Sequence, residues 1–147
     1  MFVEGMLPTA RKRLVAIKHD APLMAAARLL DGRHFKLVVV CDAAGRMVGV
    51  VTRTDIVRQM GHCDGGACAA AAATTMTRDV AFCRPSDHLR HVWSIMTERG
   101  LYHIPVVDEN HAPLGVINAR DALLELLEDS EHQEALLRDY IMGVGYR

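Results

Sequence analysis

The sequence predicts an α/β (α+β) fold made of two β-α-β-β-α repeats that pack together as a pseudo-twofold pair. Two stretches lead to this prediction: Val48–Asp55 and Leu114–Asp121 each contain a short apolar run that ends in a polar residue, with aspartate three positions later. Such a run is typical of a buried strand that leads directly into a capped helix. One unit of this kind exposes an apolar sheet face that it cannot cover alone, so we expect two units to pack together.

The two stretches belong to an internal duplication. Asp121 follows Asp55 by 66 positions (121 − 55), and the same offset aligns most of the two halves without a gap. It superposes apolar, charged and glycine positions: Leu23 on Leu89, Arg33 on Arg99, Val40 on Val106, Asp42 on Asp108 and Gly49 on Gly115. We therefore divide the chain into a leader (1–13), a first repeat (14–60), a linker (61–75), a second repeat (76–128) and a C-terminal helix with a tail (129–147).

Apolar periodicity and turn chemistry place the elements of the first repeat. Short apolar runs indicate strands, a proline in the first turn favours a helix start, and Asp-Ala-Ala-Gly favours a turn. In chain order we expect a strand at Leu14–Ile17, a helix from Pro22 that Gly32 ends, a strand at Leu37–Cys41, a turn at Asp42–Gly45, a strand at Met47–Val51, and a helix at Asp55–Met60 with Ile56 and Val57 facing inward.

The second repeat is expected to follow the same order. Its first helix would be ended by Gly100, and Ser130–Gln133 resembles a capping box that predicts the start of a further helix. The expected elements are a strand at Val80–Cys83, a helix opened by Arg84–Asp87 with Leu89, Val92, Trp93 and Met96 in the core, a strand at Ile104–Val107, a turn at Asp108–His111, a strand at Leu114–Ile117, and a helix from Asn118 through Leu127.

Composition narrows the class of protein. The 147 residues are 50% hydrophobic, enough to bury a core, and a net charge of −1 gives no bulk attraction to nucleic acid or to an anionic membrane. Four cysteines without a signal peptide or an apolar spanning stretch lead us to expect a cytoplasmic protein. No nucleophile elbow, P-loop, zincin or dinucleotide motif occurs, so we assign no catalytic residue and predict no enzyme.

The duplicated unit resembles a pair of CBS (cystathionine-β-synthase) domains, the arrangement called a Bateman module. The resemblance rests on Gly49–Asp55, Gly100–Asp108 and the opening Met76–Val80, and it covers about residues 10–128. It implies a regulatory protein, including the energy-sensing kind, that binds AMP, ADP, ATP or S-adenosylmethionine in clefts between the repeats. It also implies a homodimer that signals to an unknown partner protein and needs no cofactor beyond the regulatory ligand.

The residue chemistry at the two helix starts suits a nucleotide. A carboxylate in the first turn of a helix can accept hydrogen bonds from both ribose hydroxyls, and the free N–H groups there favour a nearby phosphate. By resemblance, adenine lies against backbone groups of the strand that leads to Val106. The residues expected to bind the ligand are Lys36, Leu37, Val38, Thr52, Arg53, Asp55, Tyr102, His103, Ile104, Pro105, Asn118, Arg120 and Asp121.

A purely structural interpretation of these helix starts stays open. Thr52 and Asp55 also form an ordinary N-cap, which stabilises a helix by about 1 kcal/mol without any ligand. The second repeat has Asn118 where the family usually has Ser or Thr, and the first has Val39 where the second has Pro105. These departures leave open whether one cleft or both bind ligand.

Two other functions fit the sequence. If the clefts are empty, the protein is a dimerisation or scaffold protein, and the last helix could supply its interface through Leu136, Leu137, Tyr140 and Ile141. The alternative is a metal or redox sensor in the linker, since three thiols and an imidazole match the usual zinc ligands. Its candidate residues are His62, Cys63 and Cys68, with Cys83 as a fourth.

Overall fold

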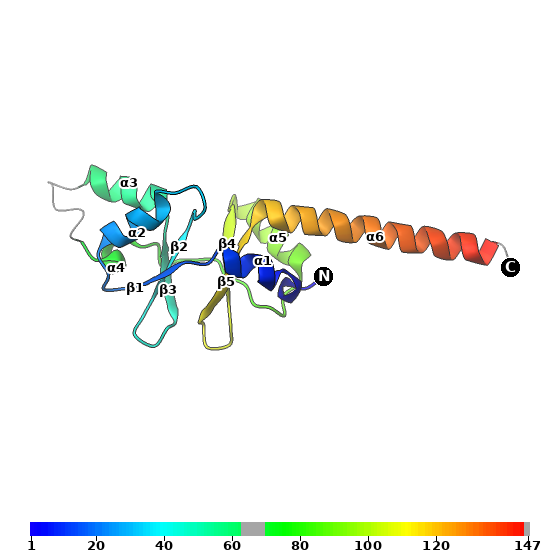
Figure 1. Cartoon of the computed structure of the whole chain (residues 1–147), viewed down its shortest axis with the longest axis horizontal. Coiled ribbons are helices and arrows are strands. Elements are labelled where there is room, and N and C mark those ends of the chain that lie inside the picture. The colour runs from blue at the N-terminus through cyan, green and yellow to red at the C-terminus, as the bar shows by residue number, and fades with distance from the viewer. Residues whose placement is uncertain (63–69, 146–147) are drawn as a thin grey trace.

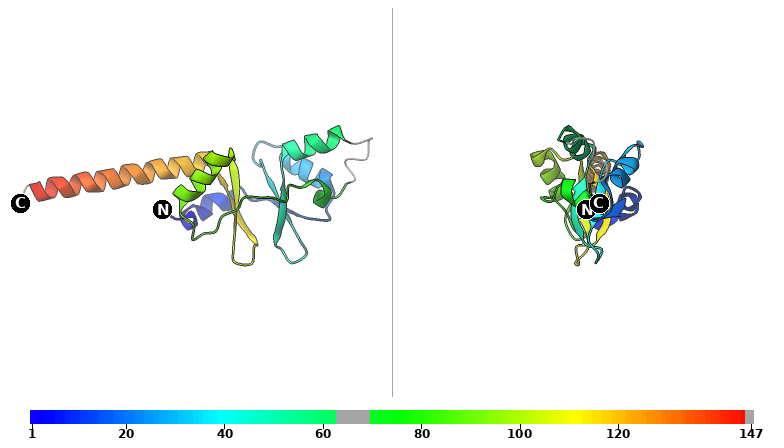
Figure 2. Two further views of the ribbon diagram at one scale, coloured as in Figure 1. Left: turned by 180° about the vertical axis from the view of Figure 1, so that it is seen from behind. Right: turned by 90° about the vertical axis from the view of Figure 1, so that its left-hand side faces the viewer.

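Two repeats lie side by side in the computed structural model, and a long C-terminal helix extends from the second one (Figure 1). The structure describes residues 1–62 and 70–145. Each repeat combines a small sheet with two helices, and the two hairpins point in the same direction (Figures 1 and 2). This mixture of helices and sheets confirms the predicted fold class.

The first repeat comprises β1 (Ala16–Lys18), α2 (Leu23–Leu30), β2 (Val38–Cys41), β3 (Met47–Val51) and α3 (Arg53–Gly61). Its sheet has the order β1-β2-β3, with β1 parallel and β3 antiparallel to the central strand. The first three residues of β2 are all valines with no exposed surface, because the sheet covers one core with each face.

The second repeat comprises α5 (Leu89–Arg99), β4 (His103–Val107), β5 (Pro113–Asn118) and α6 (Ala119–Gly145). Strands β4 and β5 pair antiparallel, and Gly100 ends α5 in the left-handed conformation. The predicted strand Val80–Cys83 is wrong, because of these four residues only Cys83 pairs, through one parallel bridge to Val106. Just after it, the carbonyls of Pro85 and Asp87 accept hydrogen bonds from the N-terminal segment of the chain.

The same strand register recurs in both hairpins. Val40 lies opposite Gly49 in the first and Val106 opposite Gly115 in the second, and each hairpin has a bulge at the next residue. Each turn is held by its first residue, an aspartate that accepts bonds from N–H groups two and four residues later. The 66-residue duplication is therefore preserved in three dimensions.

The segment that precedes each repeat packs against the other repeat. The 3₁₀ turn η1 (Val3–Met6) and α1 (Leu7–Lys12) join the core of the second repeat, and α4 (Ala72–Thr75) joins the core of the first. Two equivalent glycines permit this close approach. A Cβ atom on Gly115 would lie 2.7 Å from the Ala10 Cβ atom of α1, and one on Gly49 would contact Met76.

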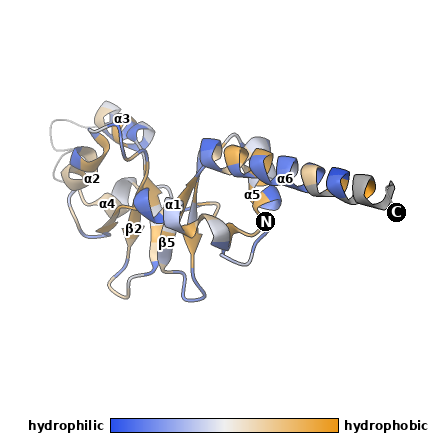
Figure 3. Cartoon of the chain, turned by 45° about the vertical axis from the view of Figure 1, so that its right-hand side comes forward, coloured by the Kyte–Doolittle hydropathy of each residue, from blue (hydrophilic) through white to orange (hydrophobic). Residues whose placement is uncertain are grey.

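A third apolar cluster joins the two sheets and fixes one repeat against the other. The strands of both repeats are largely hydrophobic (Figure 3). The buried members of the cluster come from both hairpins: Leu37, Val39, Met47, Val50, Val107 and Val116.

Two helix predictions are wrong. Val57 was expected to face inward but is 68% exposed, since Ile56 and the buried Asp55 take the inner face of α3. No helix starts at Ser130, because α6 runs without a break over 27 residues. Gln133 donates to Asp129 within the helix instead of reaching back to Ser130, so the expected capping box does not form.

Candidate functional site

Asp121 lies in the first turn of α6, which begins directly after β5. Asn118 is the helix cap, as predicted: its side-chain oxygen accepts the backbone N–H groups of Arg120 at 2.9 Å and of Asp121 at 3.3 Å. The cap thus needs no oxygen from Asp121. The Asp121 side chain keeps 19% of its surface exposed, and its carboxylate is available for other partners.

An arginine from the start of the chain holds that carboxylate. Arg13, at the C-terminal end of α1, donates from Nε to the Asp121 Oδ2 atom at 2.6 Å and from Nη2 to Oδ1 at 3.2 Å. One guanidinium therefore engages both oxygens in a bidentate pair. The Arg13 side chain is 31% exposed, so the pair lies at the border between protein and solvent.

His103, the first residue of β4, is held in its neutral form. Its Nε2 atom lies 3.1 Å from the Asn118 Nδ2 atom. Because the Asn118 oxygen caps α6, its amide N–H faces the ring, and Nε2 accepts the bond without a proton. Burial lowers the pKa of His103, and the charges of Arg13 and Lys36 lower it further, against the opposing effect of Asp121.

We call Arg13, Lys36, His103, Asn118 and Asp121 the second-repeat cluster. Lys36 is exposed and comes from the first repeat, just before β2, and its charge acts on His103 from across the two repeats. Four of these five residues were predicted as ligand-binding residues. A site between the repeats requires such a convergence.

The equivalent carboxylate of the first repeat is enclosed by the fold. The Asp55 Oδ2 atom accepts the backbone N–H of Thr52 at 2.8 Å and its hydroxyl at 3.1 Å. The Thr52 oxygen accepts the Asp55 N–H at 3.4 Å in return, which completes a capping box. Oδ1 accepts the hydroxyl of Thr77 at 2.9 Å and lies 3.6 Å from the guanidinium of Arg58. Asp55 is only 3% exposed. We call Thr52, Asp55, Arg58 and Thr77 the first-repeat cluster.

Arg53 is tied to the end of another helix. Its guanidinium donates to the carbonyl of Leu30 at 3.0 and 2.7 Å and to that of Gly32 at 2.8 Å, which satisfies the free carbonyls at the C-terminal end of α2. The equivalent position in the second repeat is Ala119. Arg53 thus has a structural role in the first repeat that has no counterpart in the second.

The remaining predicted residues differ in what they offer a ligand. Arg120 and Tyr102 are exposed, Tyr102 by 77% of its surface. The other four side chains are buried in the apolar cores, so they can present only backbone groups: Leu37, Val38, Ile104 and Pro105.

Sequence reasoning missed three residues of the two clusters: Arg13, Arg58 and Thr77. Thr77 lies in the opening Met76–Val80 of the second repeat, but no sequence pattern predicts its contact with Asp55. Arg13 belongs to a short basic run in the leader, where a solvated charge is the ordinary interpretation. The fold brings it to Asp121 because α1 crosses to the second repeat.

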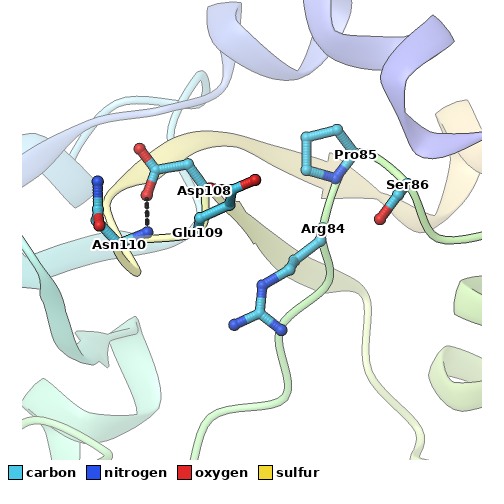
Figure 4. Close-up of a pocket in the computed structure, with 6 residues that line it drawn as sticks. All are labelled: Arg84, Pro85, Ser86, Asp108, Glu109 and Asn110. Atoms are coloured by element: carbon cyan, nitrogen blue, oxygen red, sulfur yellow. Dashed lines mark hydrogen bonds between the residues drawn. The ribbon is translucent and has the colours of Figure 1, made fainter.

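Three hollows on the described surface are not lined by Asp55 or Asp121, although Arg53 lines one of them and Tyr102 another. One of about 390 Å³ lies beside the β4–β5 turn (Figure 4). In it Asp108 accepts the N–H of Asn110, and Arg84 stacks on Phe82 at 5.4 Å, so both charged groups already support the local fold. Two apolar grooves of about 220 and 250 Å³ occupy equivalent places, between α2 and α3 and between α5 and α6.

The predicted metal or redox site gains no support from Cys83. Cys63 and Cys68 lie outside the described residues, and His62 is exposed just after α3. Cys83 is 2% exposed in the core, where burial first and the charge of Asp87 second raise its pKa to about 12. A buried thiol that keeps its proton is inert in redox exchange, so Cys83 lends the redox alternative no support. Within residues 1–62 and 70–145, no three His, Cys, Asp or Glu side chains group as metal ligands.

In the part of the chain that the structure describes, no helix combines the length and the apolar character that spanning a membrane requires.

Comparison with known proteins gives a consistent family. The CBS-domain family model matches residues 6–62 and 71–128. The chain is 24% identical over 136 residues to an uncharacterised 17.7 kDa protein of Acidianus ambivalens, covering 92% of this chain and 81% of that one. It spans only 22% of a homoserine O-acetyltransferase of Methanocorpusculum labreanum, to which it is 28% identical over 77% of its own length.

Two solved structures show the same fold. The CBS-domain protein ATU1752 of Agrobacterium tumefaciens superposes with a TM-score of 0.70 at 27% identity, covering 83% of this chain and 90% of that one. The CBS domain pair of protein MJ0100, solved in complex with 5′-methylthioadenosine and S-adenosyl-L-methionine, superposes with a TM-score of 0.70 at 20% identity, covering 88% and 98%.

Proposed function

Because the chain belongs to the CBS-domain family, we propose that it is a regulatory module that binds an adenosine-containing ligand (AMP, ADP, ATP or S-adenosylmethionine) between its repeats. Asp121 carries the proposal. It is a part-exposed carboxylate at a helix start, held by one arginine side chain and placed among residues of both repeats. The complex of MJ0100 with two adenosine compounds supports this ligand class.

The second-repeat cluster supplies what each part of a nucleoside needs. The Asp121 carboxylate accepts the ribose hydroxyls, and the N-terminus of α6, with Arg120, favours a phosphate. Adenine lies against backbone groups of Leu37, Val38 and Tyr102–Pro105. Binding favours one arrangement of the repeats, which a homodimer or a partner protein senses. Asp55 is only 3% exposed, whereas the Asp121 side chain keeps 19% of its surface exposed, so we assign ligand binding to the second cluster.

Thermal unfolding with AMP, ADP, ATP and S-adenosylmethionine tests the proposal. A ligand at a hundred times its Kd should stabilise the protein by about 2.7 kcal/mol. We expect this shift in the natural chain and in Glu109→Gln, a matched change at an exposed turn acid, but not in Asp121→Asn. If none of the four compounds at millimolar concentration raises Tm, the proposal is wrong.

A second role, assembly with another copy of the chain, is favoured by α6. Its 27 residues extend about 40 Å at 1.5 Å per residue, and its second half projects away from the body (Figures 1 and 3). Four large apolar side chains lie within one stripe of this helix at helical spacing. They are Leu123, Leu127, Leu137 and Ile141, and they are 39, 51, 60 and 60% exposed.

The spacing of the stripe fits a second α6 that runs antiparallel. Leu127 and Leu137 lie at equal distances from His132, and so do Leu123 and Ile141. A two-fold axis at His132 therefore sets Leu127 against Leu137 and Leu123 against Ile141 of the partner. Parallel pairing would instead set the Glu134 of each copy against the other in the apolar seam.

Disulfide trapping tests this assembly. We would place Leu127→Cys and Leu137→Cys in separate chains, with Cys63 and Cys68 changed to serine. Antiparallel pairing predicts a linked dimer only when the two variants are mixed, because the Cα atoms must lie within about 7 Å. Linkage of each variant to itself would show parallel pairing. Absence of linkage above that of a Val57→Cys control on α3 would exclude assembly through α6.

A further inference from the structure

The Arg13–Asp121 pair occupies the atoms that a ribose would use. Both Asp121 oxygens accept from the guanidinium, at 2.6 and 3.2 Å, and the two side chains are only partly exposed. In the first repeat the corresponding carboxylate is satisfied by neutral donors of the fold, with Arg58 at 3.6 Å. A ligand that binds Asp121 therefore has to displace Arg13 and offer its guanidinium another acceptor.

The charges around this pair favour an anion. Arg13 neutralises Asp121, and within the described residues neither Lys36 nor Arg120 forms an ion pair with an acidic side chain. The positive charges of Arg13 and Lys36 both lower the pKa of His103, and the Asn118 amide donates to its unprotonated ring nitrogen. The cluster thus has one negative and two positive charges, with a further arginine next to Asp121.

Resting on the proposed adenosine site, we infer that the ligand is a phosphate-bearing nucleotide and that Arg13 exchanges the Asp121 carboxylate for its phosphate. When the ribose hydroxyls donate to Asp121, the guanidinium loses a bidentate acceptor in a half-buried place. A phosphate offers the same bidentate geometry and a comparable charge, so Arg13 stays paired. Adenosine and 5′-methylthioadenosine supply no such anion, and S-adenosylmethionine brings a sulfonium cation into a positive site.

Calorimetric titration tests the exchange with AMP, ATP, adenosine and S-adenosylmethionine. For the natural chain we expect AMP to bind at least about tenfold more tightly than adenosine, as one charge-assisted bidentate contact provides. Arg13→Met should bring the two affinities together by weakening AMP while adenosine keeps or gains affinity. Arg58→Met, the arginine beside the other carboxylate, is the matched control and should keep the preference for AMP.

The outcomes separate this inference from the proposed function. If no adenosine compound binds, or Asp121→Asn binds as well as the natural chain, the proposed function itself fails. If Asp121→Asn abolishes binding but Arg13→Met keeps the natural preference, or S-adenosylmethionine binds more tightly than AMP, only the exchange is wrong. Salt gives a second measurement on the unaltered protein, since added salt should weaken AMP binding strongly and adenosine binding little.

Discussion

Asp55 and Asp121 stand at equivalent positions, three residues after the cap of equivalent helices, and the fold treats them differently. Asp55 is 3% exposed and is bonded by two threonines of the fold, while Asp121 keeps 19% of its side chain exposed and bonds to Arg13. The first carboxylate is bonded to its own helix cap, and we propose that the second exchanges Arg13 for a ligand. A duplicated motif can thus keep one copy for structure and leave the other for a ligand.

The caps of the two helices are bonded differently. The Thr52 hydroxyl oxygen accepts one backbone N–H, that of Asp55, and the Thr52 backbone N–H donates to the Asp55 carboxylate, so the aspartate is part of the cap. In the second repeat the Asn118 oxygen alone accepts two backbone N–H groups of α6. The cap of α6 is thus complete without Asp121, whereas the cap of α3 includes Asp55.

The largest expected effect comes from removing each carboxylate in turn. Asp55→Ala leaves the Thr52 N–H and the Thr77 hydroxyl without their acceptor, and should lower the free energy of unfolding by about 2–4 kcal/mol. Asp121→Ala breaks a part-exposed ion pair and should cost less than about 1 kcal/mol. Urea unfolding at pH 7 measures both. Equal losses would show that the two aspartates have the same structural role.

The next effect tests the two crossing segments. A Cβ atom on Gly115 would lie 2.7 Å from the Ala10 Cβ atom and 2.8 Å from its backbone carbonyl carbon. Gly115→Ala should therefore lower the free energy of unfolding by about 1–3 kcal/mol. It should also displace α1 with Arg13 and so weaken AMP binding. In Gly49→Ala the added Cβ atom would clash with Met76 and the Thr77 carbonyl oxygen, and should lower the free energy of unfolding. AMP binding should be kept, because this contact is made by Gly49 in the first repeat and does not involve Arg13. Gly32→Ala, with nothing within 4 Å, is the control and should change stability by less than about 0.5 kcal/mol. Equal AMP affinity in the two clashing variants would contradict this assignment.

How much of the fold and of the candidate site could be predicted depended on how far apart the contacting residues lie in the sequence. Both helix caps, the aspartate turns and Gly100 follow from residues within a few positions of one another, where local chemistry decides the conformation, and the repeat follows from comparing the two halves at a constant offset. Arg13 and Asp121 are 108 positions apart, and no local pattern joins them. Their contact depends on α1 crossing to the opposite repeat, which only the packed fold reveals.

The errors in the helices have a related cause. Val57 is apolar and lies next to Ile56, so periodicity alone could not tell which of them faces the sheet, and the buried Asp55 decided it. Ser130–Gln133 has the residue types of a capping box, but those residues are also tolerated inside a helix whose flanking positions favour helix strongly. A pattern of residue types cannot show whether the preceding turn is already helical.

A smaller effect should follow from the threonine that completes the first-repeat cluster. Thr77→Val removes the hydroxyl that donates to Asp55 at 2.9 Å, and should lower the free energy of unfolding by about 1–2 kcal/mol. In an Asp55→Ala background the same change should cost much less, since its partner is gone. A double-mutant cycle by urea unfolding measures this coupling, and strictly additive losses would contradict it. Arg13→Met, the comparable change in the second cluster, should cost less than about 1 kcal/mol.

The smallest expected effect is a pH dependence confined to the second-repeat cluster, where His103 replaces the Leu37 of the first repeat. Burial, followed by Arg13 and Lys36, lowers the pKa of His103 below its unfolded value of about 6.5. The unfolded chain therefore takes up this proton first, so the contribution is complete above pH 6.5 and is lost as pH falls.

Replacing the ring isolates this contribution to stability. His103→Gln should flatten the stability curve between pH 7 and 5 relative to the natural chain, as urea unfolding at several pH values would show. NMR titration of the ring protons measures the pKa directly, and Arg13→Met should raise it by removing a positive neighbour. AMP should raise it as well, since its phosphate offsets the charges of Arg13 and Lys36. A His103 pKa at or above 6.5 in the ligand-free natural chain would contradict the positive field on which the preference for anions depends.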